Sequence, residues 1–91
     1  MTRIDKEKIS ELVFPAQEVL SDKTAIEDRK VILHRATSLG NLEKHKVIIT
    51  FEDAEGIKEV FTTIWAITDN KAILKGGRVL PVQRIHKVVI S

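Results

Sequence analysis

The chain has 91 residues, of which 43% are hydrophobic and 31% charged, with a formal net charge of +2 and no cysteine. This composition is typical of one folded domain, and the missing cysteines exclude disulfides, thiolate metal sites and a cysteine nucleophile. The charged first residues argue against a signal peptide, and no apolar run approaches the roughly 18 residues of a membrane span, so we expect a cytoplasmic protein.

A short helix is predicted over residues 5–13. Ile9, Leu12 and Val13 fall on one stripe at helical spacing, and acidic residues lie in the first turn, where the helix dipole favours them. Pro15 ends this helix, because the residue before a proline is driven out of the α region.

The clearest predicted helix covers residues 24–39. Thr24 and Glu27 have the spacing of a capping box, and apolar residues then recur on one face. Gly40 follows the last apolar residue and is the predicted C-cap, since glycine accepts positive φ. A strand over residues 30–34 is the competing interpretation, but the start, period and end of the pattern all favour the helix.

β-Branched and aromatic residues separated by turn residues predict a series of strands after residue 45. If Glu52 faces Ile57 across the first turn, then Ile48 faces Phe61. Gly76-Gly77 predicts a tight turn between two later strands. The predicted strands cover residues 46–52, 57–67, 72–75, 78–81 and 85–90.

Together these elements predict a single α+β domain over residues 1–91, in which two helices within residues 1–41 pack on a β-rich part, residues 45–91. Both faces of the first two strands are partly apolar, which indicates a curled antiparallel sheet with a packed interior. We therefore predict an SH3-like or Sm-like small barrel of about five strands. An open sheet with both helices on one face is the alternative.

Several short motifs between residues 34 and 85 carry a resemblance to known proteins. They are His34-Arg35-Ala36-Thr37-Ser38-Leu39-Gly40-Asn41, Phe51-Glu52-Asp53-Ala54-Glu55-Gly56, Thr62-Thr63-Ile64-Trp65-Ala66, Leu74-Lys75-Gly76-Gly77 and Leu80-Pro81-Val82-Gln83-Arg84-Ile85. This order of motifs resembles a group of short bacterial proteins without an assigned function. The strand–glycine–strand hairpin is also loosely similar to Sm-type RNA-binding barrels. The first resemblance implies no catalytic or binding residue, and a shared fold does not by itself imply a shared function.

The sequence favours no catalytic or metal chemistry. His34, His45 and His86 lack the spacing that places two imidazoles on one metal ion. The acidic residues 53–59 fall in a predicted hairpin, where solvated carboxylates are far commoner than an acid–base pair. No serine lies in a G-x-S-x-G motif. We expect no cofactor, no metal and no enzymatic activity.

We expect instead a non-catalytic interaction domain. Ile48, Phe61 and Trp65 lie on the strand face that contributes less clearly to the core, and they are the candidate surface for a protein partner or a second copy. The alternative is a nucleic-acid-binding small barrel, because no acidic residue follows residue 69 and the C-terminal end is basic. Its candidate contacts are Lys71, Lys75, Arg78, Arg84 and Lys87.

Overall fold

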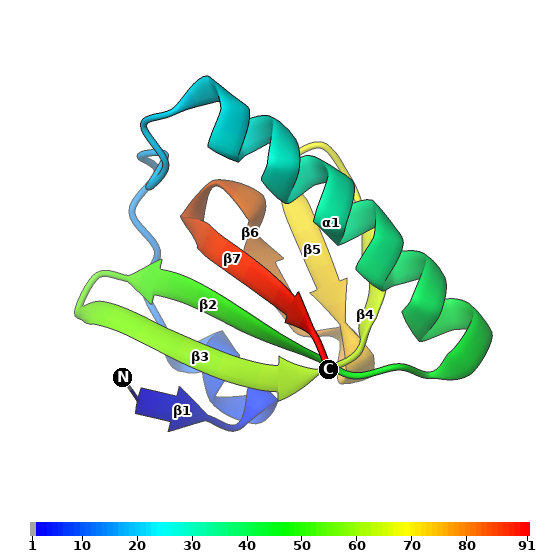
Figure 1. Ribbon diagram of the computed structural model, residues 1–91. Coiled ribbons are helices and arrows are strands. Elements are labelled where there is room, and N and C mark those ends of the chain that lie inside the picture. Colours follow the sequence, from blue (N-terminus) through cyan, green and yellow to red (C-terminus); the bar gives the residue numbers. More distant parts are fainter. Residues whose placement is uncertain (1) are drawn as a thin grey trace.

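The computed structural model describes residues 2–91, and over this range the chain forms one long helix and two small β-sheets (Figure 1). Sheet A has the strand order β1-β3-β2-β7, and sheet B has the order β4-β5-β6. The strands are β1 (Thr2–Ile4), β2 (Val47–Asp53), β3 (Gly56–Thr62), β4 (Ile64–Ile67), β5 (Lys71–Leu74), β6 (Val79–Pro81) and β7 (Ile85–Ile90). The helices are the long helix α1 (Lys23–Glu43) and the 3₁₀ helices η1 (Lys6–Glu11), η2 (Lys75–Gly77) and η3 (Val82–Arg84).

The predicted five-stranded barrel is wrong, because within residues 2–91 the strands divide into two sheets that do not close. The single strand predicted over residues 57–67 breaks at Thr63, so that β3 ends in sheet A and β4 begins in sheet B. The carbonyl oxygen of Thr63 accepts a hydrogen bond from Lys75 N at 2.9 Å, and this contact with the following turn marks the break.

The N-terminal helix predicted over residues 5–13 is also wrong, so the chain does not begin with two α-helices. Residues Thr2–Ile4 form β1, which runs parallel to β3, and only a 3₁₀ helix follows. Of the apolar stripe, Ile9 alone is fully buried. A helix this short has little stability of its own, so tertiary contacts decide its conformation.

Helix α1 is longer than predicted at both ends. Asp22 is the N-cap in place of Thr24, because its side chain accepts a hydrogen bond from Thr24 N at 3.3 Å. The left-handed C-cap is Lys44 (φ 54°) rather than Gly40. Gly40 lies inside the helix, where a Cβ atom would stand 2.5 Å from the carbonyl oxygen of Ile64. A glycine at position 40 therefore allows α1 and β4 to pack closely together. No helix within residues 2–91 is both long and apolar enough to cross a membrane.

The predicted hairpin of β2 and β3 is confirmed in register, with Glu52 opposite Ile57 and Ile48 opposite Phe61. Strand β7 has the predicted bounds and pairs with the other edge of β2, which places Val89 opposite Ile48. Three neighbouring strands of sheet A thus share one row, Val89–Ile48–Phe61.

The glycine turn between β5 and β6 is confirmed as well. Gly76 and Gly77 have φ values of 86° and 87°, a region that other residues rarely adopt. Strand β6 ends at Pro81 on the edge of sheet B, where a proline does not interrupt hydrogen bonding to a further strand.

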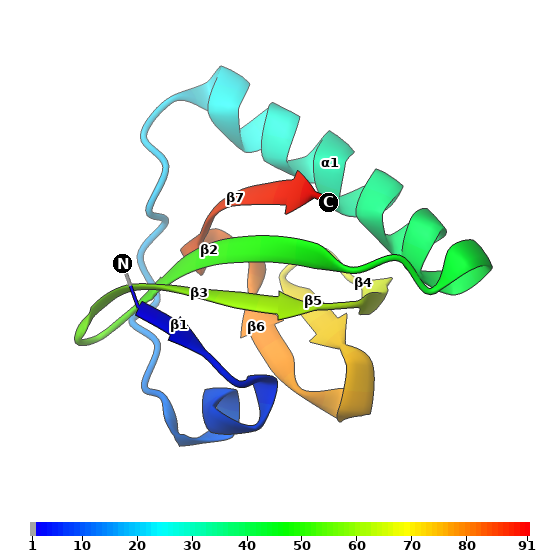
Figure 2. The same cartoon turned by 60° about the horizontal axis from the view of Figure 1, so that its bottom comes forward.

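The core lies between the two sheets and α1. The helix contacts β4 and β7, which are edge strands of different sheets, so α1 bridges the opening between them (Figure 1). Helix α1 and the 3₁₀ helix η1 lie on opposite sides of the strands (Figure 2). The fully buried apolar side chains include Leu33 and Ala36 of α1, Val47, Ile49 and Phe51 of β2, and Val60, Ile64, Ala72, Leu74, Leu80 and Ile85.

Candidate functional site

Two aromatic side chains are exposed at the end of the molecule where β3 passes into β4. Trp65 is 46% exposed and Phe61 is 42% exposed, whereas Phe51 is fully buried. Ile48, the third residue of the predicted apolar surface, is half-buried beside Phe61. Phe61 and Ile48 belong to sheet A and Trp65 to sheet B, so the predicted surface extends across the junction of the two sheets.

Trp65 forms one wall of a pocket of about 300 Å³, which we call the Trp65 pocket. Three lysines from separate parts of the chain also line it: Lys44 follows α1, Lys46 precedes β2 and Lys75 follows β5. The other lining residues are Gly40, Asn41 and Thr63, so among residues 2–91 no carboxylate lines this pocket.

Backbone contacts fix the walls of the Trp65 pocket. The side-chain amide of Asn41 donates to the carbonyl oxygens of Trp65 (3.1 Å) and Thr37 (3.0 Å), which ties the end of α1 to β4. The hydrogen bond from Lys75 N to Thr63 O brings the β5–β6 turn to the same place. The pocket is therefore held by regular elements rather than by a long loop.

The three pocket lysines lack partners of opposite charge. None of them forms an ion pair with another residue between 2 and 91. Lys46 extends over the ring of Phe61, with Nζ 5.4 Å from the ring centroid, and Arg3 Cζ lies 5.7 Å from the same centroid. Neighbouring positive side chains that have no anionic partner attract an anion to the surface between them.

The apolar row Val89–Ile48–Phe61 adjoins this basic surface. Val89 is 44% exposed, and the next row on the same face is polar because it carries Thr50 and Lys87. The apolar strip is therefore one residue wide along each strand. It can add to an interface but is narrow for a protein contact of ordinary size.

The structure does not bring the predicted basic residues of the C-terminal end together. Only Lys75 lines the Trp65 pocket. Lys71 lies at the opposite end of β5, Lys87 lies on the outer face of β7, and Arg78 is half-buried after the glycine turn. Lys44 and Lys46, which sequence reasoning missed, join Lys75 instead. Their convergence depends on how α1, β2 and β5 meet, and no local pattern in the sequence signals it.

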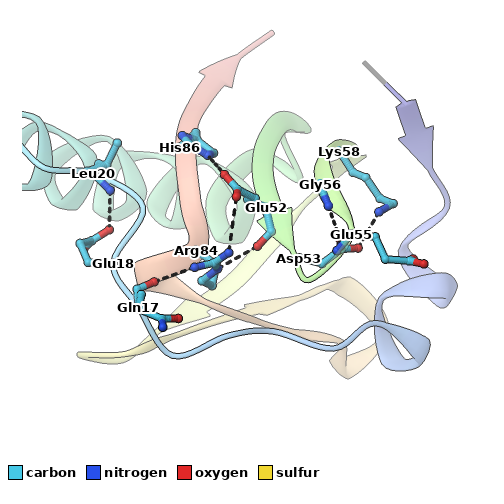
Figure 3. A network of polar contacts seen from close by, with 10 residues as sticks. All are labelled: Gln17, Glu18, Leu20, Glu52, Asp53, Glu55, Gly56, Lys58, Arg84 and His86. Carbon is cyan, nitrogen blue, oxygen red and sulfur yellow. Dashed lines mark hydrogen bonds and ion pairs between the residues drawn. The ribbon is translucent and has the colours of Figure 1, made fainter.

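Arg84, the remaining predicted contact, is a buried residue that is 5% exposed. Its Nε donates to the carbonyl oxygen of Glu52 and one terminal nitrogen donates to that of Gln17, both at 2.9 Å (Figure 3). The carboxylate of Glu52 also binds His86 Nε2 at 2.8 Å. Arg84 thus holds residues 12–22, the connecting segment between η1 and α1, against sheet A.

Arg29 of α1 holds the same connecting segment from the other side. It is 6% exposed, and its terminal nitrogens bind both carboxylate oxygens of Glu18 at 2.7 and 2.5 Å and the carbonyl oxygen of Ile85 at 3.0 Å. These hydrogen bonds from the guanidinium lower the pKa of Glu18 below its ordinary value. All the acceptors of Arg29 lie within the chain, so this cation is structural.

The acidic turn is structural too. Asp53 Oδ1 accepts from the backbone amides of Glu55 (2.7 Å) and Gly56 (3.0 Å), and Oδ2 binds Lys58 Nζ at 2.7 Å (Figure 3). Burial raises the pKa of Asp53, but the Lys58 ammonium and the two amides outweigh burial, so the pKa lies below its ordinary value. Glu59, which also belongs to the acidic residues 53–59, pairs with Arg3 of the adjacent strand β1 at 3.0 Å.

The three histidines lie apart and have different surroundings. His86 binds Glu52, His45 Nε2 contacts the carbonyl oxygen of Ser91, and His34 is exposed on α1. Among residues 2–91, no group of His, Asp and Glu side chains is placed to hold a metal ion.

A larger pocket of about 370 Å³ lies between α1 and the turn after β4. Its walls are mainly apolar, and its exposed charges include both Lys30 and Asp69. Arg29 also lines it but is already bound to Glu18. This pocket does not concentrate one chemistry, and the Trp65 pocket is the stronger candidate site.

No protein-family model, curated protein or solved structure matches the chain. The function is therefore argued from the geometry of the Trp65 pocket.

Proposed function

We propose that the protein is a non-catalytic binding domain and that its Trp65 pocket binds single-stranded nucleic acid. The convergence of Lys44, Lys46 and Lys75 on one exposed tryptophan carries this proposal. Proteins that bind single strands combine cations that follow the phosphate backbone with aromatic rings on which unpaired bases stack. The Trp65 pocket presents both features within one small surface.

The surroundings of the pocket strengthen the match to a polyanion. Arg3 and Lys46 extend the positive surface to Phe61, and the carboxylate nearest to Arg3, that of Glu59, is already paired with it. A strand bound at Trp65 therefore meets one further cation, Arg3, beside Phe61, where Asp5, Lys6 and Glu7 also line the surface. A single strand carries a planar base on every nucleotide, whereas an acidic peptide matches the charges without a stacking group at each residue.

The proposal is tested by fluorescence anisotropy of labelled single-stranded RNA and DNA at low and physiological salt. We expect binding that weakens with salt, because phosphate contacts release counterions. Trp65→Ala should lower the affinity by about 30-fold, the middle of the range for one stacked base. Lys75→Glu should lower the affinity more than Trp65→Ala does, since the substitution reverses a charge inside the pocket.

Lys71→Glu is the matched control, because Lys71 lies at the opposite end of the same strand, away from the pocket. It makes the same change in net charge as Lys75→Glu. Equal losses for both variants, or binding indifferent to salt, would show that the pocket is not the site.

A second candidate is binding of a protein partner or a second copy of the chain, and the exposed row Val89–Ile48–Phe61 favours it. The solution mass at tens of micromolar tests the second-copy form. A dimer that dissociates on Val89→Glu would support the apolar row as its interface. A monomer would exclude self-association at that concentration.

A further inference from the structure

The two exposed aromatic rings are not equivalent. Phe61 has two cations over its ring, Lys46 and Arg3, whereas among residues 2–91 no cation lies over the ring of Trp65. A base that stacked on Phe61 would displace these cations and lose their attraction to the ring. A base that stacks on Trp65 displaces no charge. Trp65 is therefore the free stacking platform, and Phe61 holds cations in place.

The size of the pocket limits what can stack there. At about 300 Å³ it lies at the lower end of the range for small-molecule sites. That volume is sufficient for one base with its sugar, and Trp65 supplies one exposed ring on which a base can stack. Cations border the pocket on more than one side, since Lys46 extends towards Phe61 whereas Lys75 approaches from the glycine turn.

Resting on the proposed function, we infer that the Trp65 pocket takes one unpaired nucleotide of a strand, with its base on Trp65 and its flanking phosphates on the lysines. Lys46 and Arg3, which both lie against the Phe61 ring, hold the phosphate on the sheet A side. Lys75, at the glycine turn, holds the phosphate on the other side, and Lys44 adds a third positive charge to the pocket. One domain thus recognises one nucleotide and two phosphates.

The Trp65 pocket discriminates only weakly between the different bases. The side-chain nitrogen of Asn41 already donates to Thr37 O and Trp65 O, so this amide offers a base edge no donor and a single acceptor atom, Oδ1. Stacking strength then sets the preference, which favours the larger purine rings over pyrimidines.

Short strands that carry a single base test this inference. Trp65 is the only tryptophan and the chain has no tyrosine, so intrinsic fluorescence reports on this pocket alone. One adenine placed centrally in an otherwise abasic strand should quench Trp65 and raise affinity roughly five- to 150-fold over the fully abasic strand. A central thymine should give a smaller gain. Methylphosphonate linkages on both sides of the adenine, which are uncharged, should remove most of the affinity.

Variants separate the two rings. Trp65→Ala should abolish the gain from the single adenine, and Ile57→Ala, which alters an equally exposed side chain at 46%, is the matched surface control. Phe61→Leu should lower overall affinity yet keep the ratio between the single-adenine and abasic strands. Thermal unfolding of each variant verifies that it is folded.

Three outcomes have distinct meanings. Affinity that rises by an equal step with every added adenine would overturn the one-nucleotide site while leaving nucleic-acid binding intact. So would a Phe61→Leu variant that loses the single-adenine gain. An all-adenine strand that fails to bind at low salt would overturn the proposed function itself.

Discussion

The connecting segment of residues 12–22 and the Trp65 pocket both depend on cations, but they use them in opposite ways. At the segment, Arg29 and Arg84 are 6% and 5% exposed and direct donors to acceptors within the chain, and of the Arg29 nitrogens Nε is left buried without a partner among residues 2–91. At the pocket, the lysines are exposed and have no ion-pair partner within residues 2–91. Satisfied donors stabilise the fold, and unsatisfied ones are available to a ligand.

The difference also follows the chemistry of the two side chains. The guanidinium is a planar fork that binds a carboxylate with two parallel hydrogen bonds, as Arg29 does with Glu18. The lysine ammonium is a mobile point charge on a flexible stem, which suits a phosphate whose position varies along a strand. The number of basic residues in a segment therefore does not indicate ligand binding unless the partner of each residue is known.

The largest effect is expected for Arg29→Ala. It leaves Glu18 without its partner and Ile85 O without a donor, and should lower the free energy of unfolding by about 3 kcal/mol. The estimate is at the low end for buried pairs, because the Glu18 side chain is 30% exposed. Urea unfolding followed by circular dichroism measures the loss. Lys30→Ala, the exposed neighbour on the same helix, should change stability by less than about 0.5 kcal/mol.

Gly40→Ala should have the next largest effect. Alanine favours a helix over glycine by about 1 kcal/mol, but its Cβ would stand 2.5 Å from Ile64 O, and overpacking costs about 1–3 kcal/mol. We expect a net loss of about 1 kcal/mol in urea unfolding and a shift in Trp65 emission as α1 moves away from β4. Ser38→Ala, on an exposed position of α1, should not destabilise. A stabilised Gly40→Ala variant would mean that helix and strand are not in tight contact.

The pH dependence of stability should be smaller still. Because Arg29 lowers the pKa of Glu18, the unfolded chain takes up a proton at a higher pH than the folded protein does. The stabilisation contributed by the Arg29–Glu18 pair is therefore fully present above the ordinary glutamate pKa of about 4.3. It is lost as the pH falls through the folded-state pKa of Glu18. Urea unfolding measured from neutral to acidic pH should show that the stability of Glu18→Gln falls less steeply than that of the parent protein. Asp53, whose pKa is also lowered, should leave some decline in that variant.

Substitution of the three pocket lysines should have the smallest effect on stability and a large effect on binding. Replacing Lys44, Lys46 and Lys75 together by glutamine should leave the free energy of unfolding within about 0.5 kcal/mol of the parent. The slope of log affinity against log salt for a single strand should become shallower by about 1.4, since two phosphate contacts are lost and each contributes about 0.7. Glutamine at Lys71 and Lys87 is the control and should leave the slope nearly unchanged.

Sequence reasoning succeeded where the determinants are local or fixed by alternation. The register of β2 on β3 followed from a turn and a period of two, and the bounds of β7 followed from its β-branched run. It failed at Thr63, where one apolar run serves two sheets, and at Gly40, which resembles a helix end but permits a close contact. Strand β1 was missed because three residues carry no periodic signal and their partner lies over fifty residues later.

The candidate site was predictable only in part. Phe61 and Trp65 were singled out, since an apolar residue on the second face of a strand pair needs an explanation. The interpretation of Lys75 as part of a C-terminal basic region placed it with Arg84, which turned out to be buried. Lys44 and Lys46 border an ordinary connection between α1 and β2, and only the tertiary fold brings them to Trp65.

Helix α1 also has a consequence for self-aggregation, because it lies on β4 and β7. Each is the last strand on one side of its sheet, and such strands are templates for adding a further chain. Asn41 and Arg29 occupy the carbonyl oxygens of Trp65 and Ile85 on these strands. A variant whose helix detaches would expose both templates. Helix α1 therefore protects these two edges against the addition of a further strand.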